Sequence, residues 1–182
     1  MSGIFLNDEE LRKRLQLVAS RLQNPLELTS TLERVLVSQT LQNFHANGRP
    51  AWAGLSPVTL EIYRKQGITP QGILQRSPAG LKASIQGDHD RDSATVMAGS
   101  GQSKNYAAIH QFGGMAGRGR KVKIPARPYL PIDENGFLQP EAERAVGMVA
   151  GHYWQKIFNP YPPLNLPLIG WRLLKLNGSL SA

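Results

Sequence analysis

The residues best suited to acid–base chemistry in this chain are its histidines, which stand far apart. His110 lies in the segment YAAIHQFGG, over residues 106–114, beside a glutamine and an aromatic residue. A histidine paired with a carboxylate can act as a general base, and Asp133 in KIPARPYLPID is the candidate partner. No nucleophile motif or cofactor motif accompanies the pair, so we expect no catalytic residue and interpret His110 as structural. The four histidines are His45, His89, His110 and His152.

Metal and nucleotide chemistry are also poorly supported. The histidines show none of the short pairings of zinc or iron sites, and the chain has no cysteine. The segment GDHDRD has alternating aspartates, but it lacks the glycine and the glutamate of a calcium loop, so a charged hairpin turn is expected. GMAGRGR follows no clear strand and opens no helix, which argues against a phosphate-binding loop. We expect neither a metal nor a cofactor.

Positive charge dominates the chain, which has a formal net charge of +8. The stretch from Ser93 to Ile132 contains no acidic residue. Its field would attract DNA phosphates or an acidic protein surface, although a merely solvated loop remains an alternative. Few aromatic residues interleave with the cations, so contact with DNA would involve the backbone without sequence readout. The candidate contact residues are Arg118, Arg120, Lys121 and Lys123.

Two amphipathic helices are predicted to open the chain. Apolar residues at helical spacing predict the first over residues 7–22, capped by Asn7 or Asp8. A capping box formed by Ser30 and Glu33 predicts the start of the second. Such apolar stripes pack in a core or against another subunit, and we expect the core. The stripes consist of Leu11, Leu15, Val18 and Leu22, then of Leu32, Val35, Leu36 and Phe44.

The middle of the chain combines short elements with ordered loops. Helices are predicted over residues 57–65 and 140–158, each beginning with a proline that suits a first helical turn. Apolar alternation over residues 81–85 predicts a strand that turns through GDHDRD into a second strand at 93–99, and residues 121–124 add another. The predicted class is α+β, with amphipathic helices packed on a small antiparallel sheet and long loops.

The C-terminal residues 159–182 differ in kind. Prolines at four positions favour an extended backbone, yet the segment is strongly apolar. We therefore expect a domain over residues 1–158 and an extended, Pro-rich C-terminal arm over 159–182, docked on its own domain or on a neighbour. The N-terminus does not look like a signal peptide, and no stretch approaches a membrane span. The expectation is a soluble, unexported protein without a membrane partner.

Four stretches follow one another along the chain: AWAGLSPVTLEIYRK, GILQRSPAGLKASI, ATVMAGSGQSKNYAAIHQFGG and KIPARPYLPID. In this order they resemble the phage virion morphogenesis family, the tail-completion proteins of Mu-like and P2-like phages. Together they reach from Trp52 to Asp133, and the pair IHQFGG and IPARPYL is the specific part. Pro78 departs from the family pattern, and the arm is an extension, which leaves open the place of this member in the particle.

The resemblance implies a structural protein of the phage neck or tail, without catalysis. Such proteins act in tail completion or as tail terminators, and they join the tail to the head-side connector, usually as a symmetric ring. Six copies are the first expectation and twelve the alternative. The implied partners are copies of the chain itself, other neck, connector and tail-tube proteins, and DNA in the channel. Assembly would take place in the host cytoplasm. A DNA-binding protein without sequence specificity is the alternative function.

The specific motifs carry the candidate interface or structural residues. We expect the apolar side chains of YAAIHQFGG to bury one side of a short turn, while His110 and Gln111 hydrogen-bond to backbone and the glycines reverse the chain. Two prolines in IPARPYL would let Arg127 project toward a carboxylate. The loop over residues 113–123 is expected to be poorly ordered in a free subunit and, once the ring assembles, to become fixed or to face the DNA channel. The candidates are Tyr106, His110, Gln111, Phe112, Gly113, Gly114, Pro125, Arg127, Pro128, Tyr129 and Trp171.

Overall fold

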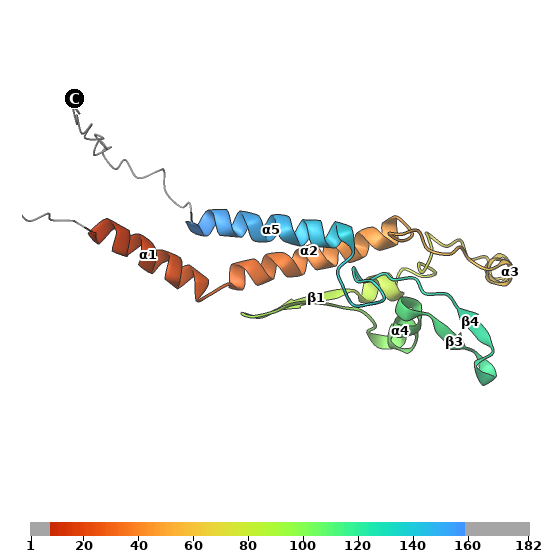
Figure 1. Ribbon diagram of the computed structural model, residues 1–182. Coiled ribbons are helices and arrows are strands. Elements are labelled where there is room, and N and C mark those ends of the chain that lie inside the picture. Colours follow the sequence, from red (N-terminus) through yellow and green to blue (C-terminus); the bar gives the residue numbers. More distant parts are fainter. Residues whose placement is uncertain (1–7, 159–182) are drawn as a thin grey trace, which may run out of the picture.

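The computed structural model describes residues 8–158, and this part of the chain is elongated (Figure 1). Two long helices run side by side along it, and two separate β-hairpins accompany them, which confirms the α+β class. Within these residues the α-helices are α1 (Glu9–Leu22), α2 (Leu26–His45), α3 (Pro57–Lys65), α4 (Lys104–Phe112) and α5 (Pro140–Phe158). The strands are β1 (Gln86–His89), β2 (Ala94–Met97), β3 (Gly114–Ala116) and β4 (Val122–Ile124), and the 3-10 turns are η1 (Leu81–Ser84), η2 (Gly101–Ser103) and η3 (Arg118–Arg120).

Helices α2 and α5 pack against each other in antiparallel orientation (Figure 1). Near one end of the pair, the Lys156 ammonium group bonds the Glu27 carboxylate. Near the other end, Asn43 Nδ2 donates to Gln139 Oε1 at 2.9 Å. Helix α5 begins and ends at the predicted residues, and its predicted apolar face is buried or half-buried. That face consists of Ala142, Val146, Val149, Tyr153 and Ile157.

Helix α1 precedes α2 and lies against the last turns of α5. Arg21 Nη1 donates to the Lys156 carbonyl at 3.0 Å, and the Tyr153 hydroxyl donates to the Arg21 carbonyl at 3.3 Å. The apolar face of α1 stays exposed, with Leu11 at 51% and Leu15 at 59% exposure. The prediction that this face belongs to the core is therefore wrong, because within residues 8–158 the outer turns of α1 have no neighbour that covers it.

Helix α2 begins earlier than its predicted capping box of Ser30 and Glu33. The first helical hydrogen bond runs from the Thr29 amide to the Pro25 carbonyl at 3.0 Å. Ser30 lies inside the helix, where its hydroxyl donates to the Glu27 carbonyl at 3.1 Å. The box is therefore not the start signal. Pro25 provides it, because a proline has no amide hydrogen that would need a partner at a helix start.

The β1–β2 hairpin packs on α2, on the side away from α5 (Figure 1). Its second strand falls inside the predicted range 93–99. The strand predicted over 81–85 is wrong, because most of that range forms η1. There the Ser84 hydroxyl donates to the Leu81 carbonyl at 2.7 Å and accepts from the Gly99 amide at 3.0 Å. The register pairs Gln86 with Met97, Gly87 with Val96, Asp88 with Thr95 and His89 with Ala94.

The segment over residues 113–123, predicted as a loop, belongs to a second hairpin. Its strand β3 was not predicted, whereas β4 confirms the strand expected near 121–124. Gly113 at its base has a φ of 72°, and a Cβ there would lie 2.8 Å from the Ala126 backbone nitrogen. Only glycine fits this position without strain. The ordering of this segment on assembly stays a prediction.

The aromatic core lies near the end of α2, where several segments meet. The Phe44 ring is fully buried, and its centroid lies 5.8 Å from that of Trp52 and 5.5 Å from that of Tyr129. Leu81 of η1 and Ala107 of α4 complete the cluster. Because each residue comes from a different segment, this core holds together parts of the chain that no sheet connects.

Replacing Phe44 by alanine tests this core. We expect the free energy of unfolding to fall by about 3–5 kcal/mol, because the change removes a buried ring and leaves a cavity. Denaturant unfolding followed by circular dichroism measures the loss. Phe112→Ala is the matched control: Phe112 is 65% exposed, so its replacement should change stability by less than about 0.5 kcal/mol. Equal losses in the two variants would contradict the assignment of the core.

Candidate functional site

The motif YAAIHQFGG forms most of helix α4 instead of the predicted short turn, and its glutamine points into the interior. Gln111 is 3% exposed, and its Oε1 accepts from the backbone amides of Tyr129 and Leu130 at 3.0 and 2.9 Å. Buried amides need a partner, and the irregular segment over residues 125–131 has no neighbouring strand to supply one. The predicted hydrogen bonding of Gln111 to backbone is confirmed.

Arg127 is buried and bonds to backbone carbonyls. Its Nε donates to the Ala53 carbonyl at 3.0 Å, and its Nη2 donates to the Gly54 carbonyl at 2.9 Å. The expectation that it projects toward a carboxylate is therefore wrong. Burial lowers the pKa of the Arg127 guanidinium, and the nearby Tyr63 opposes that effect. Arginine stays charged nonetheless. The two hydrogen bonds of its guanidinium hold the loop before α3 against the segment over residues 125–131.

Three further side chains complete what we call the interior joint, formed by Asn43, Trp52, Gln111, Arg127 and Tyr129. Asn43 Nδ2 donates to the Tyr129 carbonyl at 3.1 Å. Trp52 Nε1 donates to the carbonyl of Pro128 at 3.2 Å, and the Tyr129 hydroxyl donates to that of Ala107 at 3.2 Å. Burial raises the pKa of Tyr129 to about 12, so its hydroxyl keeps its proton. The joint ties α2 to α4 through two irregular segments.

A second arginine fixes the loop that follows α2. Arg49 Nε donates to Asn43 Oδ1 at 2.8 Å, and its Nη2 donates to the carbonyl and the side-chain oxygen of Gln39 at 2.8 and 2.9 Å. Sequence reasoning identified neither Asn43 nor Arg49. The available signal was the pair Gln39 and Asn43, since two polar residues four positions apart on a helix share a face, and here that face is buried.

His110 does not behave as predicted. Its Nδ1 is buried and has no hydrogen-bond partner in the described part of the chain. The Tyr106 ring lies edge-on, 5.7 Å between centroids. Burial and, secondarily, the charge of Arg127 lower the pKa of His110. Asp133 Oδ1 accepts two amides of its own turn. The prediction that the His110 side chain bonds to backbone is wrong; only its carbonyl does so, accepting from the Arg127 amide at 2.7 Å.

The remaining motif residues divide between surface and interior. Phe112, expected to be buried, is exposed on the last turn of α4. Gly113 and Gly114 both have positive φ, at 72° and 149°, as predicted for a chain reversal. Pro125 and Pro128 are half-buried in the irregular segment. Trp171 and the predicted arm lie outside the described residues. The role of these positions in subunit contacts stays a prediction.

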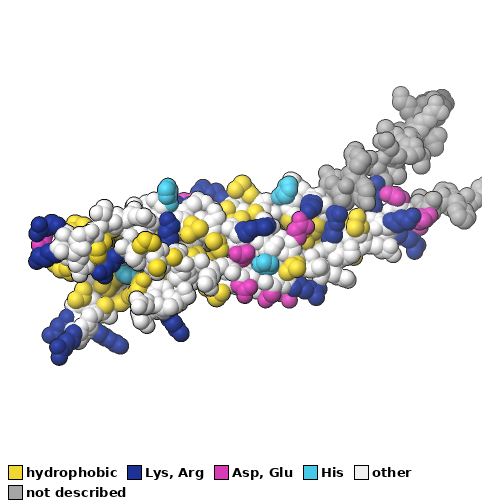
Figure 2. Space-filling model, turned by 180° about the vertical axis from the view of Figure 1, so that it is seen from behind, with side chains coloured by type: hydrophobic (Ala, Val, Ile, Leu, Met, Phe, Trp, Pro, Cys, Tyr) yellow, Lys and Arg dark blue, Asp and Glu magenta, His cyan; other side chains and the backbone are white. Residues whose placement is uncertain are grey.

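The four candidate contact cations surround the tip of the second hairpin, which we call the basic hairpin (residues 114–124). All four side chains are exposed. Figure 2 shows Lys and Arg side chains projecting from this end of the molecule. Exposed apolar side chains accompany them: Met115 at 50% and Val122 at 55%, with Phe112 at the base. The cations are Arg118, Arg120, Lys121 and Lys123.

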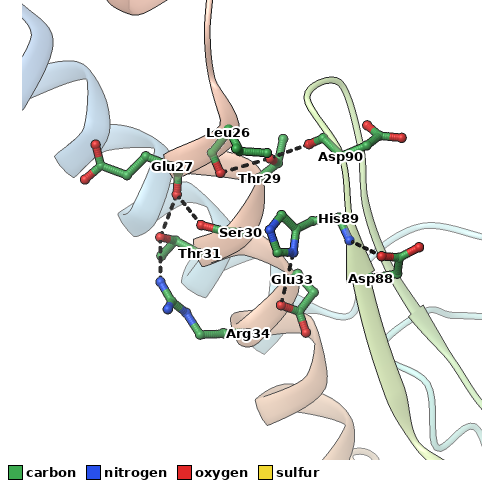
Figure 3. Close-up of polar contacts among 10 residues, drawn as sticks. All are labelled: Leu26, Glu27, Thr29, Ser30, Thr31, Glu33, Arg34, Asp88, His89 and Asp90. Carbon is green, nitrogen blue, oxygen red and sulfur yellow. Dashed lines mark hydrogen bonds and ion pairs between the residues drawn. The ribbon is translucent and has the colours of Figure 1, made fainter.

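The turn of the β1–β2 hairpin is docked on the start of α2 (Figure 3). The Thr29 hydroxyl donates to the Asp90 carbonyl at 2.6 Å, and His89 Nδ1 lies 3.6 Å from Glu33 Oε2. Asp90 Oδ1 accepts from the amides of Asp92 and Ser93 at 2.7 Å each, and these bonds lower the pKa of Asp90. The predicted turn through GDHDRD is confirmed at Asp90–Asp92, whereas Gly87, Asp88 and His89 belong to strand β1. Within residues 8–158, no group of three acidic or histidine side chains is placed to hold a metal.

Comparison with known proteins identifies the class. Residues 6–150 match the phage virion morphogenesis family. Over 136 residues the chain is 37% identical to "Mu-like prophage FluMu G protein 2" of Haemophilus influenzae, covering 73% of this chain and 87% of that protein. Over 106 residues it is 35% identical to "Putative capsid assembly protein G" of Escherichia phage Mu, covering 56% of this chain and 65% of that protein. No solved structure matches.

The chain therefore belongs to the phage virion morphogenesis family, which confirms the resemblance seen in its four motifs. Its role lies in the assembly of phage virions. No helix within residues 8–158 is long and apolar enough to cross a membrane.

The interior joint can be tested at Gln111. Gln111→Ala leaves two buried amides without an acceptor, so we expect the free energy of unfolding to fall by about 2–4 kcal/mol. Chemical denaturation measures the difference. Gln71→Ala, at an exposed position, is the control and should cost less than about 0.5 kcal/mol. A loss at Gln111 no larger than at Gln71 would show that the joint does not stabilise the fold.

The lowered pKa of His110 predicts a pH dependence of stability. The unfolded chain takes up the proton near the ordinary histidine pKa of about 6.5, whereas the folded chain takes it up only at lower pH. Stability should therefore fall as the pH drops through this range, because the unfolded state then binds more protons. Unfolding curves between about pH 7.5 and 5 measure the slope, which His110→Asn should reduce. The exposed His45, changed to Asn, is the control; equal slopes in both variants would contradict the prediction.

Proposed function

We propose that this chain is a ring-forming subunit of the phage neck or tail, acting in tail completion or as a tail terminator that joins the tail to the head-side connector. One observation carries the proposal: large apolar side chains are exposed on several helices of the single subunit. Apolar side chains that lie exposed next to one another, as Leu11 and Leu15 do on α1, mark sites of association. The residues are Leu11 at 51%, Leu15 at 59%, Val58 at 69%, Met148 at 70% and Phe158 at 61% exposure.

The placement of these residues supports a head-to-tail arrangement of copies. Helix α1 and the end of α5 lie at one end of the molecule, and α3 lies at the other (Figure 1). A subunit with two different association surfaces at its two ends can bind the next copy in the same way repeatedly, and such contacts close into a ring when the rotation permits. We propose six copies, made in the host cytoplasm and incorporated at the neck or tail of the virion.

The proposed role needs no catalysis, and the interior joint agrees with that. The side chains of Gln111 and Arg127, which belong to the specific motifs, form hydrogen bonds with backbone groups of the same chain. His110 Nδ1 is buried, away from solvent. Side chains engaged in this way position segments of the subunit and are not available to a substrate.

The exposed cations of the basic hairpin favour a second candidate, a DNA-binding protein without sequence specificity. Four adjacent cations on a projecting hairpin suit contact with phosphates. The exposed Phe112, Met115 and Val122 beside them suit a protein partner better, because contact with the DNA backbone is mostly polar. Binding of duplex DNA by the isolated subunit, falling steeply with salt, would favour this candidate.

The arm over residues 159–182 is proposed to bind the neighbouring subunit as a clasp. It lies outside the described residues, but the helix that leads into it ends in exposed aromatic rings. Trp154 and Phe158 stack at 5.6 Å between centroids and are 46% and 61% exposed. An apolar arm that starts beside them, and that contains Trp171, would extend this surface toward another copy.

Complementation of a phage that lacks the gene tests the proposal. The full chain should restore joined, infectious particles and should be found in them by mass spectrometry and electron microscopy. A chain ending at Phe158 should fold, because the core and the interior joint lie entirely within residues 8–158, yet it should not enter particles. Circular dichroism of the truncated chain is the control for folding.

Two results would count against the proposal. Particles that are complete and infectious without the protein would remove its role in the neck or tail. Normal incorporation of the truncated chain would remove only the clasp.

A further inference from the structure

We propose that the basic hairpin of one subunit docks on the acidic turn of the β1–β2 hairpin, residues 88–92, of the next copy of this chain. The inference rests on the proposed function, because it names the contact through which ring subunits associate. It is carried by two surfaces of opposite charge that project from one subunit in opposite directions.

The basic hairpin has its charge free for a partner. Within the described residues, the ion pairs involve none of its four cations. Each of the four side chains is exposed. The apolar side chains of Phe112, Met115 and Val122 are at least half exposed next to them. A surface with an apolar patch bordered by cations is typical of a protein interface, and it calls for an acidic partner with apolar residues of its own.

The acidic turn offers the complementary surface. Asp88 and Asp92 are exposed, and neither forms an ion pair with a cation in the described part of the chain. Arg91, the cation of the turn, instead donates to the Gln23 carbonyl between α1 and α2. That bond holds the turn at the connection between α1 and α2, where two leucines near Gln23 in the sequence are exposed. They are Leu22 at 43% and Leu26 at 44% exposure.

The direction of the two hairpins excludes a contact between them within one subunit. The β1–β2 hairpin runs along α2 toward α1, whereas the β3–β4 hairpin projects past α4 toward the opposite end (Figure 1). Figure 2 shows the projecting Lys and Arg side chains at that end, while most of the acidic side chains visible on this face lie farther along the molecule. The two surfaces do not meet within a subunit, but they face each other when copies follow head to tail.

Exchange of charge between the two surfaces tests the contact. One variant carries Arg118→Glu, Lys121→Glu and Lys123→Glu. The other carries Asp88→Lys and Asp92→Lys, and it keeps Asp90 because that carboxylate holds the turn. In either variant alone, like charges face each other at every junction, so we expect complementation of the deleted phage to fall at least about tenfold. Co-expression of both variants restores opposite charges at every junction of an alternating ring, so titres should return close to those of the wild type.

Covalent trapping gives a second readout. The chain has no cysteine, so Lys121→Cys together with Asp92→Cys introduces the only two thiols. Oxidation of assembled particles should produce a ladder of linked copies on a denaturing gel. Each single-cysteine variant is the control and should give no ladder.

The outcomes separate this contact from the proposed function. If each charge variant complements like the wild type, or if co-expression fails to restore titres and no ladder forms, the contact is overturned while the structural role stands. Another outcome is that the wild type binds duplex DNA in a salt-dependent way and the first variant loses this binding. If co-expression then also fails to restore the titre, the basic hairpin binds DNA and the contact is likewise overturned. If the wild-type chain is absent from particles, the proposed function itself fails.

Discussion

The structure depends on the satisfaction of backbone groups in a segment that has no sheet. Within residues 125–131, Arg127, Tyr129 and Pro131 are buried, and backbone groups that lose water there need another partner. The Gln111 side chain serves two of these amides, and Asn43 serves the carbonyl of Tyr129. Helices α2 and α4 can therefore meet at one aromatic core without a strand between them. In this chain, residues of the motifs IHQFGG and IPARPYL make this contact between α2 and α4 possible.

The hydrogen bonds that stabilise the fold are concentrated in one region of the subunit. The polar residues that hold the irregular segments lie around the core at the end of α2, whereas α1, α3 and the basic hairpin reach outward with little of their own surface covered. Such a subunit has one well-packed region, and its other elements leave much of their surface accessible to partners. Virion assembly, in which copies and partners meet in a fixed geometry, suits such a distribution of contacts.

The sequence predicted the elements that carry their own start and stop signals. Helices α3 and α5 begin at Pro57 and Pro140 and were placed correctly, because proline suits a first helical turn whatever the tertiary contacts. The ranges of η1 and α4 were misassigned, since short segments take the conformation that packing requires. In the site, Gln111 and Arg127 were identified but not the partners of Arg127. Those partners are carbonyls of Ala53 and Gly54, and a backbone acceptor leaves no mark in the sequence.

Helix α1 carries a consequence for the motions of the subunit. Its hydrogen bonds to α5 join Arg21 to Lys156 and Tyr153. None of its residues is fully buried, and Leu11, Leu15 and Leu22 are exposed. Few buried contacts mean that a segment opens locally at a small fraction of the free energy that unfolds the core. Amide protons of α1 should thus exchange with deuterium long before those of α2. The orientation of α1 can therefore change at a small cost in free energy while the core stays fixed.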